Sequence, residues 1–285
     1  MNIMYNYDLS SKEFDTIRRM VYDSIGVNLT EAKRSLVISR LSKRLRELSM
    51  ESFADYIKYL NSNPDELHTL FNYITTNVTK FFREEHHFEY LEQVFLPQFV
   101  EEARHVNGRP RLRVWSAGCS TGEEPYTLAM VLSEFFGNTS SYDIKIIASD
   151  INSETLQKAD SGVYKYEEVQ NIPRWLLKKY FKMGTGPNEG LFKVKDSLRN
   201  FVEFKQINLT EDKRYDIENQ LDMIFCRNVF IYFDRDTQRR ILERFYQHLV
   251  PTGLLFLGHS ESINNSNSDP KVWKLIKHTI YRKTG

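Results

Sequence analysis

The chain has only two cysteines, Cys119 and Cys226, among its 285 residues. They lie far apart in the sequence, so we predict neither a disulfide framework nor a cysteine-based metal centre. No apolar run approaches the length that crosses a membrane. The N-terminus, residues 1–5, lacks a basic region followed by an apolar stretch, so no secretion signal is predicted. These absences predict a soluble, cytoplasmic protein.

An excess of positive charge is also absent. The chain carries 39 Lys and Arg against 38 Asp and Glu, a net charge of +1. Proteins that bind nucleic acid through its phosphates need a basic surplus, so the composition argues against a nucleic-acid partner. A length of 285 residues instead favours one large domain with one small domain.

The first part of the chain, residues 1–74, is predicted to be helical. Its first helix begins after Ser10, ends at Gly26 and carries apolar residues at helical spacing, namely Phe14, Ile17, Val21 and Ile25. A second helix starts at Thr30 and bears the basic residues Lys33, Arg40, Lys43 and Arg44. These cations suit either a solvated helix edge or a docking surface for an acidic partner helix.

From residue 111 onward, strands alternate with helices. We expect strands at 111–117, 143–149, 221–229, 252–258 and 278–282, and helices at 124–136, 153–160, 174–182 and 235–249. This alternation predicts a mostly parallel sheet, with the last two strands pairing antiparallel at its end. Residues 184–207 break the alternation and are predicted to be short antiparallel strands.

The segment from Arg113 to Tyr126 is the most informative motif, because a strand leads through a turn into a helix. Gly118 and Gly122 permit a backbone that approaches a ligand closely. Glu123 and Glu124 follow, and they would repel a pyrophosphate but suit a ligand with hydroxyls and a positive charge. S-adenosylmethionine has a ribose and a sulfonium, so it fits this description.

The next strand ends at Asp150, where a carboxylate in such sheets accepts the ribose hydroxyls of a nucleoside. The alternative is that Asp150 only caps the helix that follows.

Two further segments place polar residues near this site. Residues 75–84 join the two parts and include Arg83, which can orient a carboxylate, although Thr79 also suits a helix cap. Arg227, Asn228 and Tyr232 follow a predicted central strand and should face the same pocket. The Asn-Pro-Pro-Tyr pattern of base methyltransferases is absent there.

Two other motifs have weaker claims. Gly258–Ser262 is similar to the nucleophile elbow of hydrolases, but Ser262 replaces the final glycine and no catalytic triad follows. His86 and His87 are adjacent, so on a helix they point to different faces and make a poor metal site.

Together, these motifs closely resemble the chemotaxis receptor glutamate methyltransferases, the CheR family. The resemblance runs in order along nearly the whole chain and is carried by residues 75–84, 120–126, 148–150, 184–187, 226–233 and 258–261. It implies a Rossmann-like α/β methyltransferase domain at 75–285, with a β-subdomain inserted at about 184–207 and an all-α domain at 1–74. It also implies methyl transfer from S-adenosylmethionine to receptor glutamates, which leaves S-adenosylhomocysteine, with no metal.

The resemblance assigns roles residue by residue. It implies cofactor contacts for Asn77, Thr79, Arg83, Glu124, Asp150, Asn208, Leu209, Arg227 and Asn228, and catalytic roles for Arg83 and Tyr232. It implies that a monomer meets the cytoplasmic helices of methyl-accepting chemoreceptors through the basic residues at 33, 40, 43 and 44. The β-subdomain is expected to grip the receptor's C-terminal tail peptide.

The chemistry agrees with this assignment, because a glutamate with a pKa of about 4.3 is already ionised at neutral pH and needs no general base. A cofactor-binding adaptor without activity is one alternative, although Arg83 and Tyr232 argue against it. A nicotinamide-dependent oxidoreductase is another, although the two glutamates at 123–124 occupy the place of its pyrophosphate.

Overall fold

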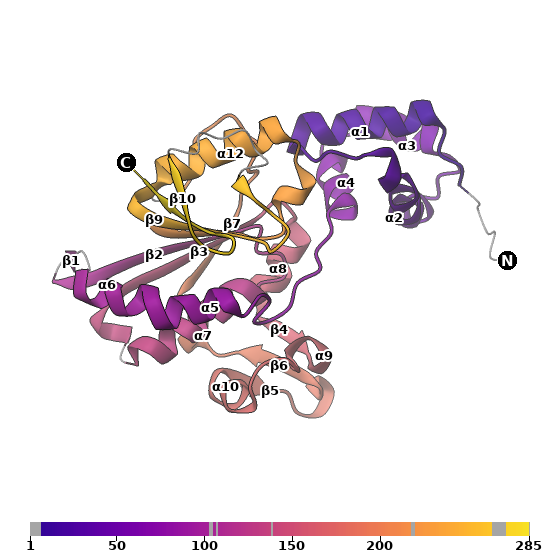
Figure 1. The fold of residues 1–285 in the computed structure, drawn as a ribbon. Helices are drawn as coiled ribbons and strands as arrows, with labels where there is room; N and C mark the ends of the chain where they lie inside the picture. The colour runs from indigo at the N-terminus through magenta and orange to yellow at the C-terminus, as the bar shows by residue number, and fades with distance from the viewer. Residues whose placement is uncertain are drawn as a thin grey trace.

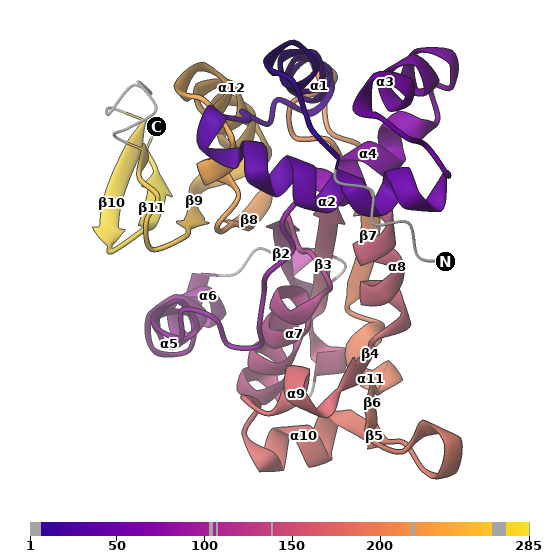
Figure 2. The same cartoon turned by 90° about the vertical axis from the view of Figure 1, so that its right-hand side faces the viewer.

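The computed structural model describes residues 7–102, 105–106, 108–137, 139–217, 220–263 and 272–284. A group of helices at the N-terminus lies against one end of a large mixed sheet, and a small second sheet lies at the far end of the molecule (Figures 1 and 2). The α/β fold class expected from the sequence is therefore confirmed.

The N-terminal helices are α1 (Ser11–Ile25), α2 (Arg34–Glu47), α3 (Phe53–Ser62) and α4 (Glu66–Ile74). Ser10 and Glu13 form a capping box at the start of α1, and Gly26 ends the helix with φ 66°. The four apolar residues predicted to face inward from α1 are all buried, which confirms that helix.

A connector, residues 75–85, runs from α4 to α5 (His86–Tyr90), and a wider helical turn at 91–95 leads into α6 (Leu96–Glu102). The alternative that Thr79 caps the next helix is therefore wrong, because that helix begins at His86. The connector instead contains two residues with positive φ, Phe82 and Glu84, and a helix cannot pass through them.

The large sheet has the strand order β10-β11-β9-β8-β2-β3-β7. Its members are β2 (Arg109–Ala117), β3 (Asp143–Asp150), β7 (Val202–Gln206), β8 (Leu221–Cys226), β9 (Leu249–Leu257), β10 (Trp273–Lys277) and β11 (Ile280–Lys283), and β1 (His105–Val106) pairs with β2. The five strands from β9 to β7 run parallel, and β11 and β10 are added antiparallel at one edge. The antiparallel end predicted from the sequence is thus confirmed.

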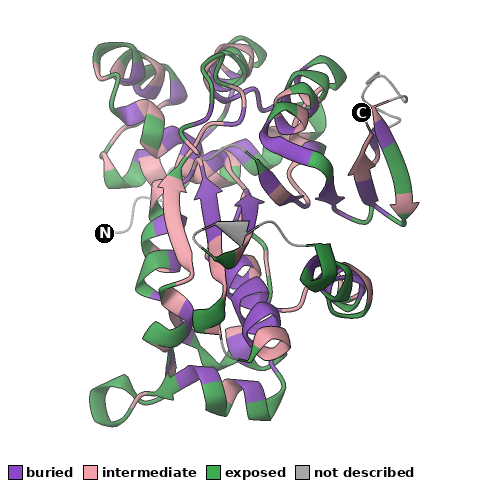
Figure 3. Ribbon diagram, turned by 90° about the vertical axis from the view of Figure 1, so that its left-hand side faces the viewer, coloured by how far each residue is buried: buried purple, intermediate pink, exposed green. Residues whose placement is uncertain are grey.

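Helices cover both faces of this sheet because successive strand residues point to opposite sides. Val114 packs in the core beside α7 (Glu123–Phe136), whereas Trp115 packs in the core beside α12 (Arg235–His248). α8 (Ser153–Ser161) follows β3 and packs against β3 and β7. Figure 3 shows the central strands as the most buried part of the molecule. The packed core therefore holds the ends of these strands in place.

The small sheet has the order β4-β6-β5 and is antiparallel. Its strands are β4 (Val163–Lys165), β5 (Phe181–Met183) and β6 (Leu191–Val194), with the short helices α9 (Tyr166–Val169), α10 (Arg174–Tyr180) and α11 (Asp196–Arg199) around them. The bounds predicted for this unit, 184–207, are wrong at both ends. Residues 202–206 pair in parallel with β3 in the large sheet, and the small sheet begins earlier, at residue 163.

None of the helices in the described part of the chain combines the length and the apolar character needed to span a membrane.

Candidate active site

A cavity opens at the carboxyl ends of β2, β3 and β8, between the N-terminal helices and the large sheet. At this edge the connections that follow neighbouring strands lead to opposite faces of the sheet. Open α/β sheets bind ligands in the crevice that this leaves. Most of the lining comes from six parts of the chain: the end of α1, the connector, the turn after β2, the turn after β3, the loop after β7 and the loop after β8.

The turn after β2 approaches the cavity closely because of its glycines. Gly118 has φ 84°, and an added Cβ would lie 2.4 Å from a methyl of Val229. Gly122 has φ 96° and precedes the first residue of α7. Any larger residue at Gly118 would therefore push the turn and the β8 loop apart, and both line the cavity.

Asp150, at the end of β3, is buried and joins two turns. Its carboxylate accepts hydrogen bonds from the backbone N–H of Ser120 (2.8 Å) and of Asn152 (2.9 Å). Burial raises the pKa of Asp150, and these backbone donors act in the opposite direction. The cap of α8 is Asn152, whose side chain accepts from the backbone of Glu154 and Thr155, so helix capping does not account for Asp150.

Glu124 lines the cavity from the first turn of α7. It accepts a hydrogen bond from the Ser116 hydroxyl (2.7 Å) and pairs with Arg227 at 3.2 Å. Burial raises the pKa of its carboxyl, and Arg227 lowers it. Glu123, which the sequence placed beside the ligand, lies outside the lining, because its carboxylate accepts from the Thr121 hydroxyl at 2.7 Å.

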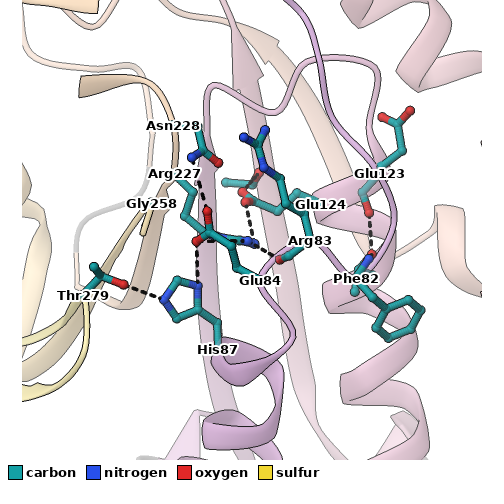
Figure 4. Close-up of polar contacts among 12 residues, drawn as sticks. Phe82, Arg83, Glu84, His87, Glu123, Glu124, Arg227, Asn228, Gly258 and Thr279 are labelled. Carbon is teal, nitrogen blue, oxygen red and sulfur yellow. Dashed lines mark hydrogen bonds and ion pairs between the residues drawn. The ribbon is translucent and has the colours of Figure 1, made fainter. Parts of the chain in front are cut away.

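The connector aims Arg83 at the cavity through an unusual backbone. Phe82 and Glu84, on either side of it, have φ of 54° and 58°. The N–H of Phe82 donates to the Thr127 hydroxyl (3.2 Å), and the Arg83 guanidinium donates to the Val78 carbonyl (2.8 Å). Figure 4 shows that the guanidinium between the carboxylates of Glu84 and Glu124 is that of Arg227, whereas Arg83 meets this group through its backbone carbonyl.

Arg227, in contrast, is enclosed, with a side chain only 2% exposed. Its guanidinium pairs with Glu84 at 3.5 Å and with Glu124 at 3.2 Å, and it also donates to the carbonyl of Arg83. Two carboxylates therefore surround a single arginine in the cavity wall.

Tyr232, in the loop after β8, contacts the N-terminal helices as well as the cavity. Its carbonyl accepts from the N–H of Asn28 (2.8 Å), and its hydroxyl lies 3.4 Å from the carbonyl of Thr76. The ammonium of Lys33 lies 5.2 Å from the centre of its ring, within the range of a cation–π contact. Asn208 makes a similar link by donating to the carbonyl of Ser24 (2.8 Å).

The ten residues predicted to bind cofactor or to act in catalysis all line this one cavity. The four basic residues expected to dock, Lys33 just before α2 and three residues on α2, are not brought together as an exposed face. Arg40 donates to the carbonyls of Ile74 and Thr75 at the end of α4. Arg44 makes two hydrogen bonds to buried Glu66, at 2.8 and 2.7 Å. Lys43 alone of the four has a side chain that is mostly exposed, at 69%.

Sequence reasoning missed several residues at the site. Ile25 and Val27 line the cavity from the N-terminal part, and their residue types carry no signal beyond that of helix core. Glu261 is buried and accepts from the backbone N–H groups of Gly258, Asn228 and Ile231, so it fixes the loop that carries Tyr232. Its sequence signal is the Gly258–Ser262 motif, which is similar to a nucleophile elbow and carries part of the family resemblance, but neither interpretation assigns a role to Glu261.

Among the described residues, no group of three or more His, Cys, Asp or Glu could hold a metal ion. His87 is fully buried, and one ring nitrogen lies 2.9 Å from the Thr279 hydroxyl. Burial lowers the pKa of His87 to about 2, so it is a neutral core residue.

Comparison with known proteins gives matches along the chain. Residues 12–75 match the family model described as CheR methyltransferase, all-alpha domain, and residues 77–280 match CheR methyltransferase, SAM binding domain. A chemotaxis protein methyltransferase of Escherichia coli (strain K12) is 45% identical over 259 residues, which are 90% of this chain and 86% of the relative. Chemotaxis protein methyltransferase 2 of Pseudomonas aeruginosa is 47% identical over 278 residues, covering 96% of this chain and 94% of the relative. A third relative, from Borreliella burgdorferi, is 36% identical over 98% of this chain and 96% of its own length.

Proposed function

Because this chain belongs to the CheR methyltransferase family, we propose that its cavity aligns a receptor glutamate with the methyl group of S-adenosylmethionine. The chain is an S-adenosylmethionine-dependent methyltransferase of chemotaxis, and it acts on chemoreceptors. The proposal concerns which side chains bind the cofactor, which handle the carboxylate and how the receptor is met. One observation carries it: Arg83 and Tyr232 line the same cavity as Glu124 and Asp150.

The donor set fits the cofactor. Asp150 keeps carboxylate lone pairs beyond its two backbone hydrogen bonds, and such a group accepts ribose hydroxyls. Asn208 and Leu209 line the part of the cavity beside the helical region, where they suit the adenine. Glu124 and Asn77 offer oxygen acceptors for the positively charged end of the molecule, and Thr79, Asn228 and Arg227 complete the wall. The cofactor supplies a methyl group activated by a positively charged sulfur.

The protein's task is alignment rather than proton transfer. The glutamate oxygen uses a lone pair to form the new O–CH₃ bond while the S–CH₃ bond breaks and its electron pair stays on sulfur. No proton is released, so no base is needed at a pH above the glutamate pKa of about 4.3. Arg83 has N–H groups beyond the one that reaches Val78, and they can hold the acceptor carboxylate beside the methyl.

Tyr232 fits a role at the methyl, because contacts hold its ring, its hydroxyl and its backbone in place. The ammonium of Lys33 lies over the ring. The carbonyl of Tyr232 contacts Asn28, and its hydroxyl contacts Thr76. A ring fixed in this way limits the positions that the acceptor carboxylate can take.

We further propose that a monomer, located in the cytoplasm, meets the Glu-rich helices of the receptor through the exposed side of α2, and that the small sheet β4-β6-β5 binds the receptor's tail peptide. Lys43 is the cation of α2 that supports the first contact, since its side chain is 69% exposed and its ammonium lies as far as 3.9 Å from the carboxylate of Glu47. Reversing its charge, Lys43→Glu, should raise the KM for receptor and leave kcat unchanged. A KM equal to that of the unaltered protein would remove Lys43 from the docking surface.

The activity is tested with S-adenosylmethionine labelled with tritium in its methyl group. The purified protein is incubated with membranes that contain chemoreceptors, and the labelled receptor is treated with mild base. Methyl esters release labelled methanol, whereas methylated nitrogen does not. Label that is stable to base would contradict carboxyl methylation.

A further inference from the structure

The turn that carries Arg83 has a backbone that its residues do not favour. Phe82 and Glu84 both have positive φ, and neither is glycine. Left-handed conformations cost free energy for residues with a Cβ, and surrounding structure must impose them. Such a turn persists only if contacts from elsewhere in the fold hold it.

Glu84 makes most of these contacts. One carboxylate oxygen accepts from the side-chain amide of Asn228 and from the backbone N–H of His259, both at 3.2 Å. The other lies 3.5 Å from the guanidinium of Arg227. The side chain is 10% exposed, and Figure 4 shows it pointing away from Arg83 toward these partners.

Arg227 closes a loop of contacts around Arg83. It pairs with Glu84 and Glu124, and it donates a hydrogen bond to the carbonyl of Arg83. Glu84 therefore fixes Arg83 twice, through the chain that follows it and through the arginine that binds its carbonyl. Glu84 itself is absent from the cavity lining, whereas Arg83, Arg227 and Asn228 belong to it.

We propose that Glu84 is a positioning residue for methyl transfer, which keeps the turn at residues 82–84 in the one conformation that aims Arg83 at the substrate carboxylate. This inference rests on the proposed function of Arg83. Glu84 touches neither substrate nor cofactor, so its loss acts on the alignment of Arg83. The step that suffers is the one that depends on the angle of approach between carboxylate and methyl.

The charge of Glu84 matters as much as its shape. A glutamine keeps one oxygen acceptor for Asn228 and His259, but it cannot pair with Arg227. Arg227 would then be drawn toward Glu124, its remaining carboxylate, and away from the carbonyl of Arg83. Glu84→Gln therefore separates the positioning role from simple filling of space.

The first experiment compares Glu84→Gln with Glu85→Gln, a neighbouring exposed glutamate outside the site. The two variants remove the same charge one residue apart. Methylation of receptor membranes gives kcat, and calorimetric titration with S-adenosylhomocysteine gives the dissociation constant. We expect Glu84→Gln to lower kcat by at least about tenfold with a dissociation constant within about threefold of the unaltered protein, and Glu85→Gln to change neither.

Three outcomes are distinct. A kcat for Glu84→Gln equal to that of the unaltered protein would overturn the inference. A fall in ligand affinity as large as the fall in kcat would also overturn it, because Glu84 would then act through the cofactor site. An unaltered protein that forms no base-labile ester would contradict the proposed function itself.

A second pair of variants excludes a merely structural role. Glycine accepts positive φ and alanine does not, so Glu84→Gly should melt at a higher temperature than Glu84→Ala. Both variants lack the carboxylate, so both should be slow, and Glu84→Gly should gain no activity from its greater stability. Activity that rises with melting temperature across the pair would refute the positioning role.

Discussion

Two arginines lie at the same cavity, and their surroundings give them different tasks. Arg227 is enclosed between Glu84 and Glu124, so its charge is used within the protein. Arg83 makes a hydrogen bond to a backbone carbonyl, that of Val78, and keeps other N–H groups for a ligand. The difference follows from burial and partners, and the residue type alone does not reveal it.

The first prediction concerns Arg83→Ala. Receptor methylation should lose about 100-fold in kcat, because the acceptor carboxylate is no longer oriented. Affinity for S-adenosylhomocysteine should fall much less, since the other residues proposed to bind the cofactor stay in place. Steady-state kinetics and calorimetric titration measure the two quantities, and an equal loss in both would contradict an orienting role.

His87 gives a prediction about pH. Burial holds its pKa near 2 in the folded protein, with Arg227 and His86 acting in the same direction, whereas an unfolded histidine titrates near 6.5. The folded pKa is depressed, so the stability that comes from neutral His87 is complete above pH 6.5 and is lost as the pH falls below it. Between pH 7 and pH 5.5 this loss is about 1.3 kcal/mol.

The measurement is urea unfolding at both pH values for the unaltered protein and for His87→Gln. Glutamine can still bond to the Thr279 hydroxyl but does not titrate. The variant should therefore lose about 1.3 kcal/mol less than the unaltered protein over this range. Equal losses would mean that the pKa of His87 in the folded protein is close to its unfolded value.

At the scale of elements, the end of α1 is where the helical part meets the cavity. Gly26 ends the helix with φ 66°, and an added Cβ would lie 2.5 Å from a methyl of Thr210. Thr210 follows Asn208 and Leu209 in the loop after β7, and those two residues line the cavity. A single helix end thus sets how close α1 comes to the loop that lines the cavity.

Gly26→Ala should therefore reduce both stability and ligand affinity. The control is Gly186→Ala, because Gly186 has φ 59° and no atom within 4 Å of an added Cβ. Both variants carry the backbone penalty of about 1 kcal/mol, but only Gly26→Ala also pushes on Thr210. Thermal unfolding and calorimetric titration should show the loss of affinity for that variant alone. An equal affinity in both would mean that the end of α1 does not shape the cavity.

Elements with strong local signals were predictable from sequence. The expected helix at 124–136 and strand at 143–149 differ from the observed α7 and β3 by one residue each, because a glycine-rich turn and a continuous apolar run define them. Val202–Gln206 was assigned to the wrong sheet, since its half-buried residues resemble those of the short strands before it. Pairing with β3 decides its place, and pairing is a tertiary property.

The same distinction applies to the site. The sequence predicts that residues after the strand ends lie close together, because parallel strands end at one edge of the sheet. The sequence does not predict that Ile25 and Val27 line the cavity, since their position depends on how the helices dock on the sheet. The internal hydrogen bonds of Arg40 and Arg44 depend on helix packing in the same way. The sequence therefore predicts an exposed basic face, although two of its four residues bind within the protein.

At the scale of the whole molecule, the cavity joins the two parts of the chain. Asn28 donates to the carbonyl of Tyr232 across the junction (2.8 Å), and Val27 pairs with Phe233. A ligand in the cavity therefore contacts residues from both parts, and its binding energy opposes their separation.

Hydrogen exchange tests this coupling. Saturating S-adenosylhomocysteine should slow exchange of the Asn28 amide as well as that of Ser120, whose N–H binds Asp150. The Gly184 amide, bonded to Leu191 in the small sheet at 2.8 Å, serves as the internal control and should not change. Protection at Ser120 without protection at Asn28 would show that the helical part moves independently of the ligand.

The partners of the Arg83 turn have a consequence for the protein's synthesis. Glu84 requires the backbone of His259, and His87 lies against Thr279 near the C-terminus. Ribosomes add roughly 5–20 residues per second, so the segment at 82–84 leaves the ribosome many seconds before these partners exist. A nascent chain thus carries every residue proposed to contact the cofactor, up to Asn228, without a fixed Arg83. Methylation can begin only after the segment that carries His259 and Thr279 has been translated.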